Sequence, residues 1–170
     1  MASRVGWFAL GSITAIAALA SGAYIYIRAG GVPMATSAAP LPLESAIAQL
    51  ALAASYGNAA QQTTPLPLDE ANLQAGARKY TEYCSVCHGE PDAQPTAIAN
   101  GMFPTPPQLF LHPVTSDPEG ITFWKVTNGI RMTGMPAFQN TLSDTDRWQV
   151  TMVLAHADRL PPRVLASLAP

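Results

Sequence analysis

The pattern of apolar and polar residues divides the chain into three parts. Residues 5–27 carry no charge and are mostly apolar. Residues 29–68 are rich in alanine, proline, serine, threonine and glutamine. Beyond residue 69, apolar residues recur at helical spacing in short stretches that glycine and proline interrupt. The pattern therefore predicts a hydrophobic N-terminal segment, a connector and a folded helical part.

The N-terminal segment is long enough to cross a membrane. A helix over residues 5–27 would reach roughly 34 Å, and a hydrocarbon core is about 30 Å thick. The alternative is a cleaved secretory signal, for which Ala18-Leu19-Ala20 is a passable cleavage site. The apolar run continues through Ile27, which is too long for a simple signal. We therefore predict a retained transmembrane anchor over residues 1–28.

The connector, residues 29–68, has the composition of a tether. Within it, residues 43–55 place leucine, isoleucine and alanine at helical spacing and predict a short amphipathic helix. Two interpretations stay open for this helix. It covers the folded domain or lies at the lipid surface, or it docks on another subunit.

Composition and charge narrow the class of protein. The chain has 170 residues and a net charge of −2, and only 12% of its residues are charged. Before residue 69, the charged residues are Arg4, Arg28 and Glu44 alone. The basic footprint of a nucleic-acid-binding protein is therefore missing, and we expect no nucleic-acid partner. Two cysteines and three histidines exclude a disulfide-dense scaffold and a zinc site with four spaced Cys or His ligands.

The strongest motif is C-x-x-C-H at Cys84, Cys87 and His88. Its spacing is typical of c-type haem attachment, in which each thiol forms a thioether to the haem and the histidine becomes the proximal iron ligand. A redox dithiol would require a β-α-β context, whereas residues 73–84 before the motif have helical spacing. We therefore predict one covalently attached haem c.

A single-haem electron carrier needs a second axial ligand, and Met135 is the leading candidate. It lies in a loop punctuated by glycine and proline, and a thioether sulfur raises the potential relative to a second histidine. Methionines more often fill a core. The alternatives are Met132, Met102, His112 and His156.

The region from about Asp69 to Pro162 resembles a class I cytochrome c domain. It is similar to membrane-anchored bacterial monohaem cytochromes whose distal loop reads G-M-P. Cys84, Cys87, His88 and Met135 carry this resemblance. It implies an all-α fold around one covalent haem, with a cytochrome c domain at residues 69–163 and a C-terminal tail at residues 164–170.

In this family the first and last helices cross near a glycine and an aromatic residue. Gly76 and Tyr80 match on the first helix, and Trp148 and Met152 are plausible partners on the last. The close approach of the two backbones would require the small Gly76.

A carbonyl in the proline region of this family accepts a hydrogen bond from the proximal imidazole. Pro104, Pro106 or Pro107 would fill that role, and the sequence does not choose between them. Lys125 or Arg131 would meet a haem propionate or simply lie on the surface.

Two further helices have recognisable ends. One begins at Asp117 as its cap and ends at Gly129, and its Trp124 lies on the haem edge or in the ordinary core. The other begins at Ser143 as its N-cap and should run to about Asp158.

The resulting expectation is an electron-transfer protein rather than an enzyme. We expect membrane redox proteins as donor and acceptor and, because haem attachment occurs outside the cytoplasm, a periplasmic domain on the bacterial inner membrane. A subunit of a larger membrane complex and an independent tethered shuttle both remain open. A haem enzyme or gas sensor with a displaceable methionine is the third alternative.

Overall fold

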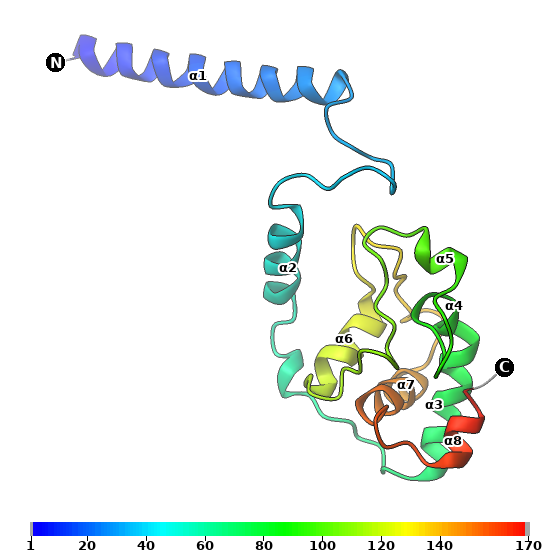
Figure 1. Cartoon of the computed structure of the whole chain (residues 1–170). Helices are drawn as coiled ribbons and strands as arrows, with labels where there is room; N and C mark the ends of the chain where they lie inside the picture. Colours follow the sequence, from blue (N-terminus) through cyan, green and yellow to red (C-terminus); the bar gives the residue numbers. More distant parts are fainter. Residues whose placement is uncertain (1, 169–170) are drawn as a thin grey trace. The chain divides into compact units, whose positions relative to one another are not determined.

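The computed structural model describes residues 2–168, which form helices joined by loops, without strands (Figure 1). The all-α prediction is confirmed. Residues 1–45 and 46–170 are two separate compact units. The helices are α1 (Ala2–Arg28), α2 (Glu44–Ser55), the 3-10 helix η1 (Ala59–Gln61), α3 (Glu70–Tyr83), α4 (Ser85–His88), α5 (Ala97–Asn100), α6 (Glu119–Asn128), α7 (Asp144–Ala155) and α8 (Pro162–Ala166).

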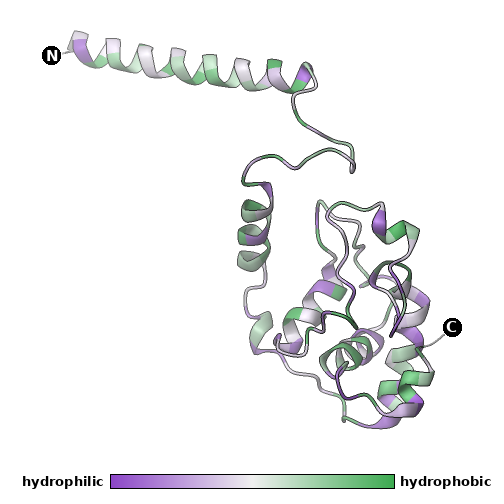
Figure 2. Cartoon of the chain, viewed as in Figure 1, coloured by the Kyte–Doolittle hydropathy of each residue, from purple (hydrophilic) through white to green (hydrophobic). Residues whose placement is uncertain are grey.

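The first unit is dominated by α1. Residues Ser3–Arg28 are long and apolar enough to cross a membrane, and none of this stretch is buried within the protein. Figure 2 shows hydrophobic or neutral residues along the helix, with strongly hydrophilic ones only near its ends. Such a helix would bury its side chains in lipid.

The predicted connector is not uniform. The helix expected at residues 43–55 is α2, and none of its side chains is buried. Residues 56–66, in contrast, pack on α6: Tyr56 meets the Trp124 ring edge-on at 5.3 Å, and the Thr64 amide donates to Glu119 Oε2 at 3.1 Å. The ring of Trp124 therefore packs against another side chain of the protein, Tyr56. This part of the connector belongs to the folded unit.

The core lies where α3 and α7 cross. Tyr80, Met152 and Val153 are completely buried there. A Cβ built on Gly76 would overlap the carbonyl oxygen of Gln149, so the two backbones touch at this glycine. The ring of Trp148 stacks on Phe123 of α6 at 4.0 Å between centroids.

Helix α7 begins as predicted and ends early. The Ser143 side chain accepts from the Asp146 amide, and the Asp146 carboxylate accepts from the Ser143 amide, forming a capping box. The helix ends at Ala155 rather than Asp158. His156 adopts φ −120°, and its Nδ1 lies 2.9 Å from the Met152 carbonyl oxygen, so the histidine closes the helix.

The predicted cap of α6 is wrong by one residue. Pro118 occupies the N-cap position, and its carbonyl accepts from the Ile121 amide at 2.9 Å. Asp117 makes no cap hydrogen bond and instead forms an ion pair with Lys125 at 3.7 Å. The attraction of an acidic side chain to a lysine replaces the cap interaction here.

The segment predicted as a C-terminal tail, residues 164–170, begins inside α8. Val164 and Leu168 are completely buried members of the core cluster, and α8 packs on α3. Residues 164–168 therefore contribute to the domain, and residues 169–170 lie outside the described residues.

Replacement of Ser143 by alanine should destabilise the domain by about 1 kcal/mol, because the first turn of α7 loses its side-chain acceptor. The hydrogen bond from the Ser143 hydroxyl holds the pKa of Asp146 below its ordinary value. A lowered folded-state pKa stabilises at neutral pH and is lost as pH falls through it. Urea unfolding should thus show a smaller difference in acid; a difference that grows in acid would contradict this account.

Candidate haem site

The C-x-x-C-H segment forms a tight turn at the end of α3. The amides of Cys87 and His88 both donate to the Cys84 carbonyl, at 3.1 and 2.9 Å. Thr96 ties α5 to this turn, because its hydroxyl donates to the Val86 carbonyl at 2.6 Å. The two thiols and the imidazole are therefore presented by one short rigid segment.

The proline loop selects the orientation of His88. Of the three candidate prolines, Pro107 supplies the contact: its carbonyl oxygen lies 2.9 Å from His88 Nδ1. A carbonyl only accepts, so Nδ1 carries the proton and Nε2 the lone pair that binds a metal. Burial lowers the pKa of His88, and the hydrogen bond to Pro107 opposes this shift. The neutral ring is favoured.

The two cysteines are half-buried and free. Burial raises the pKa of the Cys84 thiol to about 12, and the neighbouring Cys87 adds to the shift. Dithiol exchange requires a thiolate, so this environment is unfavourable for a redox dithiol.

Two further residues stabilise the turn: Tyr80, which the sequence singled out only for the helix crossing, and Gln108, which the sequence did not single out. The Tyr80 hydroxyl, buried, donates to the Gly89 carbonyl at 2.7 Å. The Gln108 amide donates to the Cys87 carbonyl at 3.1 Å and to the Pro106 carbonyl at 3.3 Å. The contact between Gln108 and Cys87 joins residues 21 positions apart, and no local sequence pattern predicts it.

Met135 lies in the loop between α6 and α7. It is half-buried, and its amide donates to Thr133 Oγ1 at 3.1 Å. Met132, its rival, is 83% exposed. The side chain of Met102 in the proline loop lies against Gly134, so the loop that holds His88 touches the loop that carries Met135.

The remaining candidates lie apart from this turn or on the surface. His112 is exposed, and His156 is engaged at the end of α7. Lys125 is engaged by Asp117 and lies 5.7 Å from the centre of the Tyr56 ring. Arg131 is exposed on the Met135 loop.

The chemistry of the two loops fits a haem. Residues 93–116 contain no acidic or basic residue apart from His112, and residues 129–142 contain only Arg131. Uncharged walls suit a large apolar macrocycle, since burying unpaired charges would be costly. A lone-pair nitrogen at His88 and two thiols on the same turn complete the donor set for haem c.

The all-helical fold and the C-x-x-C-H turn define a c-type cytochrome domain of class I. Residues 71–152 match the model of a protein family described as cytochrome C oxidase, cbb3-type, subunit III. No match to a curated protein was found. The domain is accordingly a haem c-binding domain. A cytochrome c domain indicates electron transfer rather than catalysis.

Proposed function

We propose that this protein is a membrane-anchored cytochrome with one haem c, and that it passes single electrons between membrane redox proteins. Cys84 and Cys87 would hold the haem through thioether bonds. His88 would be the proximal and Met135 the distal iron ligand. The observation that carries the proposal is the C-x-x-C-H turn whose histidine is oriented by the Pro107 carbonyl at 2.9 Å.

When bound, haem c supplies one-electron chemistry, because its iron alternates between the ferric and the ferrous state. The chain's own residues do the rest. The Pro107 carbonyl fixes the ring of His88 and strengthens its Nε2 as a donor. The Met135 sulfur would favour the reduced state, and the uncharged loops would exclude water from the iron.

Two features support the proposed location. Helix α1 has the length and composition of a membrane span, which supports a single-pass anchor. Covalent haem attachment takes place outside the cytoplasm, so the domain would lie on the periplasmic side of the bacterial inner membrane. The proposed organisation is an anchor at residues 1–28, then a connector, and a haem domain to which residues 56–66 also belong.

A subunit of a larger redox complex is favoured over an independent shuttle, because the matching family is described as an oxidase subunit. A mild-detergent native gel of the source membranes, stained for haem and analysed by mass spectrometry, distinguishes the two. A haem band in a large assembly supports the subunit. A haem band at the size of this chain alone supports the shuttle.

A haem enzyme or gas sensor is the alternative from another class. Such a protein needs an iron position that is open or easily vacated. The test is carbon monoxide added to the reduced full-length protein. Slow or negligible binding supports the electron carrier, and prompt stoichiometric binding would overturn it.

A further inference from the structure

One charged side chain is buried next to the Met135 loop. The side chain of Arg147 in α7 is only 7% exposed, whereas that of its ion-pair partner Asp144 is 84% exposed. The guanidinium also lies 5.3 Å from the centre of the Phe123 ring, which is stacked on Trp148. Buried charges are costly unless their hydrogen bonds are satisfied, so the placement of Arg147 calls for a role.

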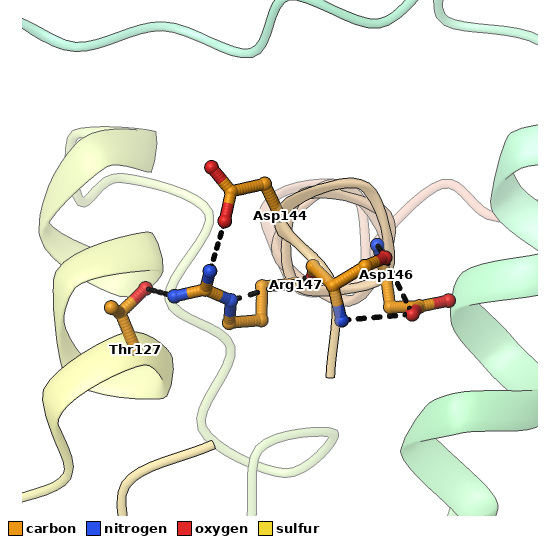
Figure 3. Close-up of polar contacts among 5 residues, drawn as sticks. Thr127, Asp144, Asp146 and Arg147 are labelled. Atoms are coloured by element: carbon orange, nitrogen blue, oxygen red, sulfur yellow. Dashed lines mark hydrogen bonds and ion pairs between the residues drawn. The ribbon is translucent and has the colours of Figure 1, made fainter. Parts of the chain in front are cut away.

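The hydrogen bonds of Arg147 join the two ends of the loop (Figure 3). Its Nη1 donates to Thr127 Oγ1 at 2.8 Å, in the last turn of α6 before the loop. Its Nε donates to the Ser143 carbonyl at 3.4 Å, at the start of α7 after the loop. Its Nη2 contacts Asp144. One guanidinium thus binds both helices between which residues 129–142 are suspended.

The base of this loop lies at the same end of α6. The amides of Phe138 and Gln139 donate to the carbonyls of Val126 and Thr127, at 3.1 and 3.2 Å. Thr127 therefore makes two contacts: its carbonyl accepts from the Gln139 amide of the loop, and its hydroxyl accepts from Arg147. A shift of Thr127 would release both contacts together.

The base is connected directly to Met135. The Ile130 amide donates to the Met135 carbonyl at 3.2 Å, and Gly129 has φ +65° with the backbone of residues 135–137 packed against its Cα. The loop turns back onto its own first residues at this point. The position of the Met135 backbone consequently depends on the end of α6, which Thr127 and Arg147 fix.

We propose that Arg147 is a positioning residue for the distal ligand: by clamping Thr127 to the start of α7, it keeps the base of the loop closed and the Met135 sulfur in place. This inference rests on the proposed function, in which Met135 binds the haem iron. Arg147 acts through Thr127 and the loop backbone and touches no reacting atom itself. A forked guanidinium suits this role better than an ammonium group.

The test uses the full-length protein with bound haem and two substitutions, Thr127→Val and Arg147→Met. The first removes the acceptor with little change in shape, so it remains informative if the second fails to fold. Arg163→Met is the matched control, because the Arg163 side chain is 84% exposed and its replacement changes the net charge identically. Arg147→Lys keeps the positive charge but removes the forked guanidinium, so it distinguishes the contribution of the charge from that of the hydrogen-bond geometry.

Two readouts distinguish positioning from general stability. Amide hydrogen exchange at Phe138 and Gln139 should accelerate by roughly tenfold in both test variants, while amides of the α3–α7 core keep wild-type protection. Carbon monoxide should bind the reduced variants roughly tenfold faster, because the sulfur leaves the iron more often. We expect Arg163→Met to match the wild type and Arg147→Lys to behave like Arg147→Met.

Each contrary result has a distinct meaning. Wild-type exchange and carbon monoxide binding in Thr127→Val and Arg147→Met would overturn the inference, as would uniform acceleration over the whole domain or full rescue by Arg147→Lys. Met135→Ala is measured in parallel. If it binds carbon monoxide promptly while the clamp variants do not, the inference alone fails; if it behaves as wild type, the proposed ligand fails as well.

Discussion

Replacement of Met135 by alanine should remove the sulfur-to-iron absorption band of the oxidised protein and lower its midpoint potential. Axial ligands set haem potentials over a range of about 0.8 V, and loss of a thioether that favours ferrous iron should cost on the order of 0.2 V. Optical spectra and a potentiometric titration measure both effects. The effect is large because Met135 would be the distal ligand bound directly to the iron.

Met132 provides the matched control for this experiment. It lies three residues earlier in the same loop and is 83% exposed, so Met132→Ala removes an identical side chain that is free in solvent. We expect its band and potential to equal those of the wild type. An intact band in Met135→Ala together with a lost band in Met132→Ala would transfer the ligand assignment to Met132.

Replacement of Gly76 by valine should abolish most of the stability of the domain. The added Cβ would overlap the Gln149 carbonyl, and Val153 Cγ2 already lies 2.9 Å from its position. Backbone atoms of a packed helix do not move aside without separating α3 from α7. Valine's advantage over glycine in helix propensity is only about 0.4 kcal/mol, whereas overpacking against backbone should cost about 3 kcal/mol or more.

The measurement is thermal unfolding together with haem content. Gly101→Val is a suitable control, because the nearest atoms to a Cβ at Gly101 lie at 3.5 and 3.6 Å, an ordinary contact. We expect the melting temperature to fall strongly in Gly76→Val and little in Gly101→Val. Equal melting temperatures for Gly76→Val and the wild type would show that the crossing tolerates a side chain.

Local chemistry explains which features of the fold were predictable. The capping box at Ser143 and the spacing of Cys84, Cys87 and His88 are encoded within a few residues. The contact between Gly76 and the last helix was also predictable, but only from the family resemblance, because a glycine by itself does not indicate which distant residue it contacts. Each of these features is visible without knowing where the loops run.

The misjudged features depend on distant partners. Asp117 has the residue type of a helix cap, but Lys125, eight residues further along, attracts its carboxylate. Pro107 could not be separated from Pro104 and Pro106, since carbonyl orientation is set by the path of the whole loop. Arg147 has no local signal except that it is a charge within a buried stretch.

Covalent attachment of one haem at the C-x-x-C-H turn is the central claim, and the intact mass of the mature protein tests it most directly. The protein purified from membranes is treated with a thiol-alkylating reagent under denaturing conditions and then weighed. The account predicts the mass of the chain plus one haem, with neither Cys84 nor Cys87 alkylated. Haem-free protein with both cysteines alkylated would contradict it.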